Sequence, residues 1–330
     1  MRIGMLTSGG DCQSLNATMR GVAKALYKMF EDVEIIGFED GYKGLMYADY
    51  QIMKPSDFSG ILTKGGTILG TSRQPFKLMR VPDENGLDKV EAMKHTYRKL
   101  KLECLVVLGG NGSQKTANLL REEGLNVVSL PKTIDNDLWG TDVTFGFQSA
   151  INVAANAIDC IHTTAASHGR VFIVEVMGDV IVAALKERSR QGKRFSILAV
   201  AEGAISKEDA ALSKKELKEK KKNQVVYPSV AYALGAQITE KTGQEVRVTV
   251  PGHTQRGGEP CPYDRVLSTR LGAAAAKLIQ EKKYGYMVAV KNNEITEVPL
   301  EEVAGKLKTV DPNCSMIQEA KMIGISFGNE

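Results

Sequence analysis

The sequence predicts an α/β protein made of two doubly wound, Rossmann-like three-layer α/β/α domains, each with a mostly parallel sheet. Three observations support this prediction. Apolar runs of strand length alternate with segments of helical periodicity along almost the whole chain. Several of these runs lead into the next helix through a short glycine-containing turn. With 330 residues, the chain is long enough to bury two cores of ordinary size.

The expected strands are short apolar runs at residues 3–6, 33–38, 103–108, 126–130, 171–176, 195–201, 246–250 and 286–290. The expected helices lie at residues 15–29, 113–123, 147–161 and 264–282. The third helix carries apolar residues at 147, 151, 154, 158 and 161, which is the spacing of one helical face. Because strands that alternate with helices normally pair in parallel, this order implies parallel sheets flanked by helices.

Composition excludes several classes of protein. The net charge of +4 is too small to indicate a nucleic-acid partner, and no apolar stretch is long enough to cross a membrane. The run at 214–222 interleaves lysine with glutamate and lacks aromatic residues, which favours a solvated helix face. A strand is expected from the first residues onward, so we expect no signal peptide. Five scattered cysteines favour reduced thiols over a zinc site or disulfide framework, so we expect a cytoplasmic protein.

The most informative segment is an acidic turn that directly follows the apolar run at 126–130. It reads Pro131-Lys132-Thr133-Ile134-Asp135-Asn136-Asp137. Ligands of open parallel sheets bind at the carboxyl edge, where such a turn would lie. Two aspartates two residues apart would repel each other unless a cation, a proton or a hydroxyl substrate lay between them. The acidic turn therefore indicates a binding site for a cation or a hydroxyl group.

Glycine-rich turns follow two other expected strands. They are residues 8–11 (Ser-Gly-Gly-Asp) and residues 109–113 (Gly-Gly-Asn-Gly-Ser), and each precedes an expected helix. Glycine lets backbone amides approach an anion closely, and the helix amino terminus adds a favourable dipole. Neither turn matches the Walker pattern or the dinucleotide fingerprint. Together with the acidic turn, they suggest phosphoryl transfer.

Four basic residues lie at or near strand ends in the second half of the chain. Arg170 precedes an expected strand, Arg247 lies within another, and His253 and Arg256 follow it. Guanidinium groups suit phosphate oxygens, and histidine can add a hydrogen bond. The four residues therefore indicate a second phosphate site.

Five segments in consistent order resemble the 6-phosphofructokinase family, from residue 1 to about residue 310. They are residues 7–11 (TSGGD), 70–73 (GTSR), 131–137 (PKTIDND), 174–178 (VEVMG) and 252–258 (GHTQRGG). The third and fifth segments are highly specific to this family. The glycine turn at 109–112 is less specific, because related nucleotide and lipid kinases have a similar turn.

The resemblance implies transfer of a phosphoryl group from ATP to O1 of fructose 6-phosphate, giving fructose 1,6-bisphosphate, with Mg²⁺ as cofactor. Asp135 would be the general base that takes the proton from the attacking hydroxyl. Thr133 would orient the sugar or the transferring group. Asp137 would help to hold magnesium, and Asn111 stands where the family often has an acidic residue.

The resemblance also implies two sets of binding residues. The donor would be bound by Gly10, Arg73, Gly109, Gly110, Gly112, Ser113 and Lys132. The sugar phosphate would be bound by Thr133, Asp135, Arg170, Met177, Gly178, Glu202, Arg247, His253 and Arg256. The implied domains are a larger donor-binding domain (1–140 plus 258–305) and a smaller sugar-phosphate domain (141–257 plus 306–330). In the family the equivalents of Arg170 and Arg247 reach across a subunit interface, which implies a homo-oligomer, a dimer or tetramer.

The chain departs from the family pattern at three places. Gly112 matches ATP-using members, whereas Lys132 matches pyrophosphate-using members, a combination found in the mixed-substrate branch. Asn111 would coordinate magnesium more weakly than a carboxylate. After Gly178 the sequence passes almost directly into an expected helix at residues 183–191, so a strand and a helix of the family pattern are missing. Two explanations are open: a true deletion, or a segment of the molecule that this sequence omits. ATP is the expected donor, with two alternatives open: pyrophosphate as donor, and an inactive sugar-phosphate-binding or regulatory paralogue.

Overall fold

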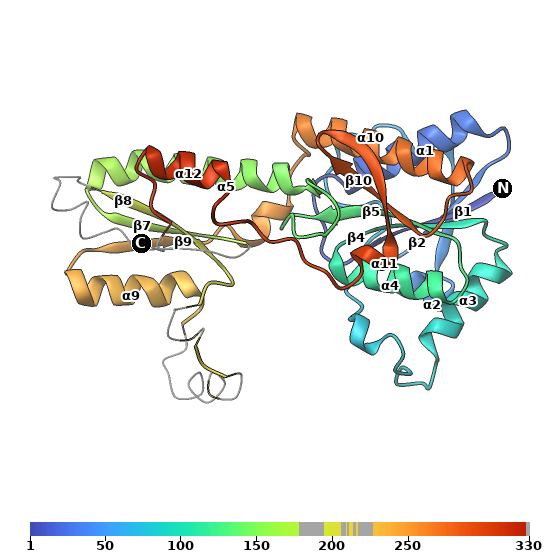
Figure 1. Cartoon of the computed structure of the whole chain (residues 1–330), viewed down its shortest axis with the longest axis horizontal. Coiled ribbons are helices and arrows are strands. Elements are labelled where there is room, and N and C mark those ends of the chain that lie inside the picture. The colour runs from blue at the N-terminus through green and yellow to red at the C-terminus, as the bar shows by residue number, and fades with distance from the viewer. Residues whose placement is uncertain (178–194, 206–208, 210, 214–215, 217–226, 328–330) are drawn as a thin grey trace. The chain divides into compact units, whose positions relative to one another are not determined.

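The computed structural model describes residues 1–177, 195–205, 209, 211–213, 216 and 227–327, which form two compact units (Figure 1). Unit 1 comprises Met1–Ile151 and Arg256–Thr309, and unit 2 comprises Asn152–Gln255 and Val310–Glu330. The expected sugar residue Gly178 and the expected helix at 183–191 lie outside the described residues, as does the basic run at 214–222 apart from Glu216.

Unit 1 is built on an eight-stranded sheet with the order β11-β10-β5-β4-β1-β2-β3, and β6 pairs with β5. The strands are β1 (Arg2–Ser8), β2 (Glu34–Phe38), β3 (Tyr50–Met53), β4 (Cys104–Gly109), β5 (Val127–Thr133), β6 (Phe145–Gly146), β10 (Tyr286–Lys291) and β11 (Glu294–Pro299). The five strands β10, β5, β4, β1 and β2 run parallel to one another. Strands β11 and β3, at the two edges, pair antiparallel with their neighbours. Strands β4 and β5 are buried throughout, which explains their continuous apolar runs.

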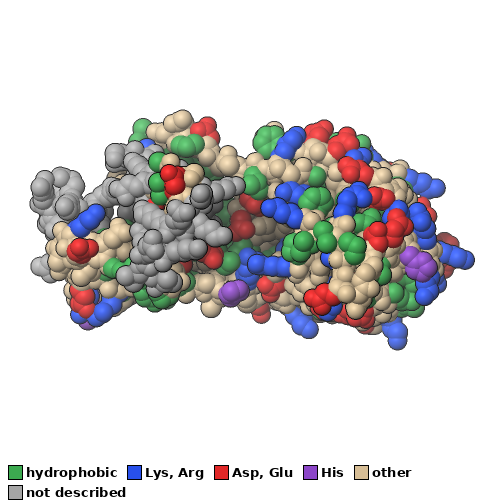
Figure 2. Space-filling model, turned by 90° about the horizontal axis from the view of Figure 1, so that it is seen from below, with side chains coloured by type: hydrophobic (Ala, Val, Ile, Leu, Met, Phe, Trp, Pro, Cys, Tyr) green, Lys and Arg blue, Asp and Glu red, His purple; other side chains and the backbone are tan. Residues whose placement is uncertain are grey.

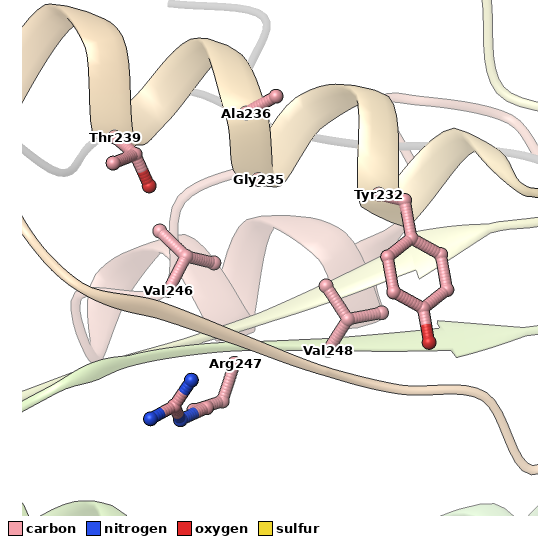
Figure 3. A pocket seen from close by; sticks show the side chains of 7 residues that line it. All are labelled: Tyr232, Gly235, Ala236, Thr239, Val246, Arg247 and Val248. Carbon is pink, nitrogen blue, oxygen red and sulfur yellow. The ribbon is translucent and has the colours of Figure 1, made fainter. Parts of the chain in front are cut away.

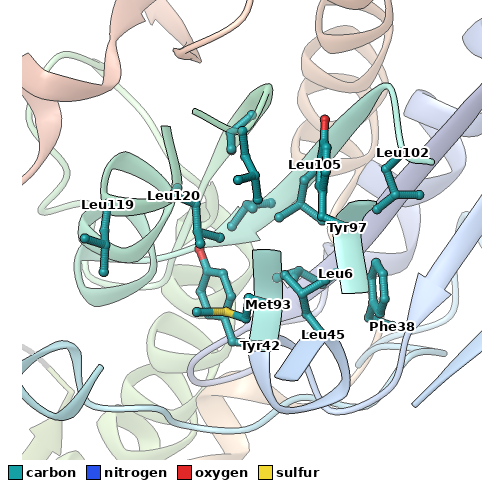
Figure 4. Close-up of a cluster of buried hydrophobic side chains, with 14 of the residues drawn as sticks. Leu6, Phe38, Tyr42, Leu45, Met93, Tyr97, Leu102, Leu105, Leu119 and Leu120 are labelled. Carbon is teal, nitrogen blue, oxygen red and sulfur yellow. The ribbon is translucent and has the colours of Figure 1, made fainter. Parts of the chain in front are cut away.

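Helices cover both faces of this sheet (Figure 1). They are α1 (Leu15–Met29), α2 (Tyr42–Tyr47), α3 (Lys89–Lys99), α4 (Asn111–Glu122), α10 (Pro262–Gln280) and α11 (Leu300–Val303), with 3-10 turns η1 (Pro55–Phe58) and η2 (Phe76–Leu78). Helices α1 and α10 approach each other closely at Gly21 and Gly272. A Cβ on Gly272 would lie only 2.5 Å from the Val22 nitrogen. On the other face, α2, α3 and α4 enclose a core that includes Leu6, Tyr42 and Met93 (Figure 4).

Unit 2 contains a three-stranded parallel sheet in the order β8-β7-β9. Its described strands are β7 (Val171–Val176), β8 (Ser196–Ala201) and β9 (Val246–Thr249). Its described helices are α9 (Val230–Thr242), α12 (Ser315–Met322) and most of α5 (Phe147–His168), and the 3-10 turn η3 (Gly252–Arg256) ends at the unit boundary. Ile173 packs with residues of α9 in one cluster, whereas Phe172 packs with residues of α5 in another. Helices thus cover both faces of this sheet as well. The predicted α/β class and the mostly parallel sheets are confirmed.

The structure also bears on the expectations about membrane-spanning segments and disulfides. Among the described helices, none is both long and apolar enough to cross a membrane. All five cysteines are unpaired. On the face of unit 1 seen in Figure 2, lysine and arginine side chains are interspersed with aspartate and glutamate, in keeping with the small net charge.

Candidate active site

The sheet of unit 1 places the three expected phosphate-site turns next to one another. Strand β4 lies between β1 and β5, and the register pairs Ser8 with Gly109 and Gly109 with Pro131. All three strands are parallel, so their carboxyl ends meet at one edge of the sheet. The two glycine turns and the acidic turn, whose first three residues still belong to β5, therefore lie side by side in that order.

The second glycine turn forms the start of helix α4. Gly110 is the N-cap residue and supplies no side-chain cap, so the first amides of α4 are left for water or an anion. The turn is tight, because a Cβ on Gly109 would lie 2.2 Å from the Ser113 Cβ. The Ser113 hydroxyl donates to the Ser8 hydroxyl over 2.9 Å, which ties the two glycine turns together. Gly112, by contrast, has open space where a Cβ would stand.

The first glycine turn is held by the neighbouring loop at 70–73. Gly9 has a φ of +88°, and its amide donates to the Ser72 carbonyl over 3.1 Å. The Thr71 hydroxyl donates to the Gly9 carbonyl over 2.8 Å. Arg73 follows directly and is exposed, so this loop carries a cation to the edge of the turn.

Two cationic side chains that are far apart in the sequence both bind the first glycine turn. Lys132 is 4% exposed, and its ammonium donates to the Gly10 carbonyl. The Arg256 guanidinium donates to the Asp11 carbonyl over 2.9 Å, and a Cβ on Gly10 would lie 2.7 Å from its Nη1. Burial lowers the pKa of Lys132 to about 8. In this structure both side chains bind backbone carbonyls, whereas the sequence assigned them to phosphate groups.

The acidic turn has a defined internal geometry. The Thr133 hydroxyl accepts from the Asp135 amide over 3.1 Å and donates to an Asp135 carboxylate oxygen over 3.3 Å. Asn136 adopts a φ of +52°, and its side-chain oxygen accepts from the Thr144 amide over 3.0 Å. These bonds leave Asp135 exposed and Asp137 half-buried. Burial and the charge of Asp135 raise the pKa of Asp137.

Two oxygen-bearing side chains could hold a divalent cation at this edge. Asn111 begins α4, and its amide nitrogen donates to the Lys306 carbonyl over 3.0 Å, so its oxygen is the atom that can meet a cation. Asp137 ends the acidic turn after the neighbouring strand β5. No cluster of three or more histidine, cysteine, aspartate or glutamate side chains suited to a metal occurs in the described part of the chain. This donor set suits Mg²⁺, which keeps several waters and needs few protein ligands beside substrate phosphates.

Cys12, which follows the first glycine turn, is a structural residue. It is fully buried, and burial raises the pKa of its thiol to about 12. A Cβ on Gly146 would lie 2.7 Å from its sulfur. A thiol so packed and protonated is a poor nucleophile.

Unit 2 brings two of its expected phosphate-binding arginines together. Strand pairing sets Phe172 beside Arg247 and Val171 beside Val246, and Arg170 immediately precedes β7. Both guanidinium groups form ion pairs with Glu245, over 2.6 Å in the case of Arg170. The arginines therefore form one cationic pair around a single carboxylate.

The remaining sugar-site candidates of unit 2 lie at the carboxyl ends of its strands. Met177 follows β7, Glu202 follows β8, and His253 lies in η3 after β9. The Met177 amide donates to the Gln255 side chain over 3.0 Å. Gln255 is buried, and the sequence had given it no separate role although it lies inside the motif at 252–258.

A cavity of about 360 Å³ lies elsewhere in unit 2, between α9 and β9 (Figure 3). It is lined by Tyr232, Gly235, Ala236, Thr239, Val246, Arg247 and Val248. Val246 and Val248 point towards α9, and the guanidinium of Arg247 lies on the other side of the strand. The helix side of this cavity is mainly apolar and contains none of the other expected site residues.

Comparison with known proteins agrees with this arrangement. The sequence model of the family described as "Phosphofructokinase" matches residues 2–181 and 179–279. An ATP-dependent 6-phosphofructokinase of Spirochaeta thermophila is 50% identical, covering 99% of this chain and 97% of the relative. ATP-dependent 6-phosphofructokinase 3 of Bacteroides thetaiotaomicron is 41% identical, covering 99% of this chain and 100% of the relative.

Solved structures share the fold. A Pichia pastoris phosphofructokinase crystallised in the T-state superposes with a TM-score of 0.73 and 28% identity, covering 92% of this chain and 37% of that one. A pyrophosphate-dependent phosphofructokinase from Marinobacter aquaeolei superposes with a TM-score of 0.75 at 19% identity, covering 94% of this chain and 86% of that one, which supports the fold alone.

The family match breaks at residues 179–181, next to the place where this sequence departs from the family pattern. The alignment with the Spirochaeta relative spans 362 positions, more than the 330 residues of this chain. The two family matches nevertheless cover most of the sequence, and both glycine turns, the acidic turn and the motif at 252–258 lie within them. The chain therefore belongs to the phosphofructokinase family.

Proposed function

We propose that this protein transfers a phosphoryl group from ATP to O1 of fructose 6-phosphate. The observation that carries the proposal is the strand register, which sets the acidic turn beside two glycine turns at one sheet edge. The 50% and 41% identical relatives are both named ATP-dependent 6-phosphofructokinases, and each match covers nearly the full length of both proteins. Phosphoryl transfer depends on positioning and charge neutralisation, which these turns are suited to supply.

The proposed roles follow from the geometry of the acidic turn. Asp135 is the general base, because it is exposed at the sheet edge while its amide is fixed by the Thr133 hydroxyl. Thr133 positions that carboxylate and the reacting groups. The donor phosphates would lie against the amides at the start of α4 and the first glycine turn, with Arg73 beside them.

Magnesium is proposed as the cofactor, held by Asp137 and the side-chain oxygen of Asn111. When bound, Mg²⁺ would neutralise charge on the donor phosphates. Because an amide oxygen is a weaker ligand than a carboxylate, the site would rely more on substrate oxygens and water.

Unit 2 is proposed to bind the sugar phosphate, and unit 1 the donor. Arg170 and Arg247 would give the 6-phosphate a paired cationic surface after Glu245 releases them, and His253 of the same unit would add a hydrogen bond. We further propose a homo-oligomer in which this arginine pair serves the site of a partner subunit. The cytoplasm is the proposed location, in keeping with five unpaired cysteines.

Pyrophosphate as donor is the second candidate, motivated by Lys132. Its buried ammonium binds the Gly10 carbonyl, so we favour a role in shaping the turn over direct contact with the donor. Steady-state rates with ATP and with pyrophosphate, at equal magnesium, distinguish the two candidates. Turnover with pyrophosphate alone would refute the ATP assignment.

The base assignment is tested by Asp135→Ser, with the exposed Asp159→Ser as control. We expect the first variant to lose about 10²-fold or more in kcat while fructose 6-phosphate binding is retained. Near-full activity of Asp135→Ser would show that another group removes the proton. Binding of fructose 6-phosphate by the wild type, without turnover on either donor, would instead support an inactive regulatory paralogue.

A further inference from the structure

A short segment near the end of unit 1 contacts both sides of the candidate magnesium site. This segment, Lys306–Lys308, follows α11 after Gly305, whose φ of +89° allows the chain to turn. We call it the strap. It lies about 170 residues after the acidic turn in sequence, and none of the family-like motifs includes it.

On one side, the strap fixes the amino terminus of α4. The Lys306 carbonyl accepts from the Asn111 amide nitrogen over 3.0 Å. Since only the amide nitrogen can donate to a carbonyl, this bond sets the orientation of the Asn111 oxygen. The side chain of Asn111 is thereby prevented from rotating freely.

On the other side, the strap fixes the acidic turn. The Lys308 amide donates to the Asp137 carbonyl over 2.8 Å, and Leu307 forms a β-bridge with Leu138. The Lys308 ammonium reaches further along the same loop, donating to the Thr141 and Asp142 carbonyls over 3.0 and 2.9 Å. Three consecutive residues thus hold the loop at 137–142 against the start of α4.

The ammonium of Lys308 is the part of the strap that a substitution can remove. It is half-buried and satisfies two carbonyl groups of a loop that has no regular secondary structure there. Without this ammonium the Thr141 carbonyl would lose its donor, whereas the Asp142 carbonyl would keep the Asn136 side-chain amide, which donates to it over 3.3 Å. By contrast, the neighbouring Lys291 contacts the same loop only at the exposed Asp142 carboxylate, over 3.3 Å.

We propose that Lys308 is a positioning residue for phosphoryl transfer: through the strap it sets the separation and orientation of Asn111 and Asp137. Catalysis by positioning is sensitive to displacements of about 1 Å, which can change rates by about 10²-fold. The inference rests on the proposed role of these two side chains in holding the metal–donor complex. It assigns Lys308 no contact with substrate.

The test compares Lys308→Met, Lys308→Arg and the charge-matched control Lys291→Met. Each variant is measured for kcat, for KM with MgATP and with fructose 6-phosphate, and for amide hydrogen exchange of the peptide covering 133–144. We expect Lys308→Met to lose about tenfold or more in kcat/KM for MgATP and to exchange faster in this peptide. Lys308→Arg, which can donate to both carbonyls, should recover most of the loss, and Lys291→Met should stay within about twofold of the wild type.

Three results would overturn the inference. The first is Lys308→Met with wild-type kinetics. The second is an equal loss in Lys291→Met, because that would indicate a general charge effect. The third is lost activity with unchanged exchange, because the ammonium would then act directly on the substrate. If Lys308→Met does not fold, Lys308→Gln, which keeps a side-chain donor, is measured in its place. We expect it to lose less kcat/KM and less protection from amide exchange at 133–144 than Lys308→Met would. Wild-type kinetics and exchange in Lys308→Gln would also refute the proposal.

The exchange measurement separates this inference from the proposed function. A wild type without phosphoryl transfer to fructose 6-phosphate would contradict the proposed function. The strap would still be tested by whether Lys308→Met, and not Lys291→Met, increases exchange at 133–144.

Discussion

The buried ammonium group of Lys132 should lower the unfolding free energy of unit 1 at neutral pH. It is 4% exposed, and burial, the largest cause, lowers its pKa from 10.5 to about 8. The folded-state pKa therefore lies below that of the unfolded chain, which binds the proton more tightly. The destabilisation is complete below about pH 8 and disappears as the pH rises from there towards the unfolded value of 10.5.

The magnitude follows from this shift. It corresponds to about 3 kcal/mol of lost unfolding free energy at pH 7, falling to about 1 kcal/mol at pH 9.5. Lys132→Met removes this cost but also removes the hydrogen bond to the Gly10 carbonyl, worth about 1–2 kcal/mol. We therefore expect the variant to be more stable than the wild type by about 1–2 kcal/mol at pH 7, and about equal to it at pH 9.5.

The assay is urea unfolding followed by tryptophan fluorescence. Trp139, the only tryptophan in the sequence, lies in unit 1 just after the acidic turn, so its emission reports on this unit. Lys277→Met in α10 is the control, since that side chain is 67% exposed. Lower stability of Lys132→Met at pH 7, or the same difference from the wild type at both pH values, would refute the reasoning.

Other predictions concern the glycine turns and a buried carboxylate. Gly109→Ala places a Cβ 2.2 Å from that of Ser113, so we expect about 1–3 kcal/mol lower stability in urea unfolding and a raised KM for ATP. In Gly112→Asp the new side chain enters open space, so the unfolding free energy should stay within about 0.5 kcal/mol of the wild-type value. In steady-state assays the rate with ATP should fall more than the rate with pyrophosphate. An equal loss with both donors would argue against this prediction. Asp264 is fully buried, and its carboxylate accepts hydrogen bonds from the Ser149 amide and hydroxyl over 3.0 and 2.5 Å. We therefore expect Asp264→Asn to lower the unfolding free energy, measured in urea, by about 1–3 kcal/mol. Unchanged stability would show that these bonds contribute little.

The sheet and its edge could be predicted from sequence because their signals are local. The runs at 103–108 and 126–130 are apolar throughout, which is typical of strands buried on both faces, and the structure buries β4 and β5 completely. Each polar turn directly follows its strand along the chain. Once the strands are parallel neighbours, the turns must meet at one edge.

The partners of the charged side chains could not be predicted in the same way. Lys132 and Arg256 were expected to bind phosphate, and no sequence pattern indicated that they would also donate to the Gly10 and Asp11 carbonyls. A sequence gives the charge of a side chain and its place on an element, but a long flexible side chain can reach several acceptors. The strap residue Lys308 had no signal at all, because its contacts with the loop at 137–142 depend on tertiary packing.

The structure also separates two positions that point to opposite donors in the sequence. Gly112 stands at the start of α4 with open space beside it, so a side chain there would project among the amides expected to bind donor phosphates. Lys132 is buried, and its ammonium binds the Gly10 carbonyl of the first glycine turn. A carboxylate at 112 would repel and crowd a nucleotide α-phosphate directly, whereas removal of the amine at 132 would shift a backbone that Arg256 and Thr71 also hold. Donor preference should therefore follow residue 112 more closely than residue 132, which favours ATP.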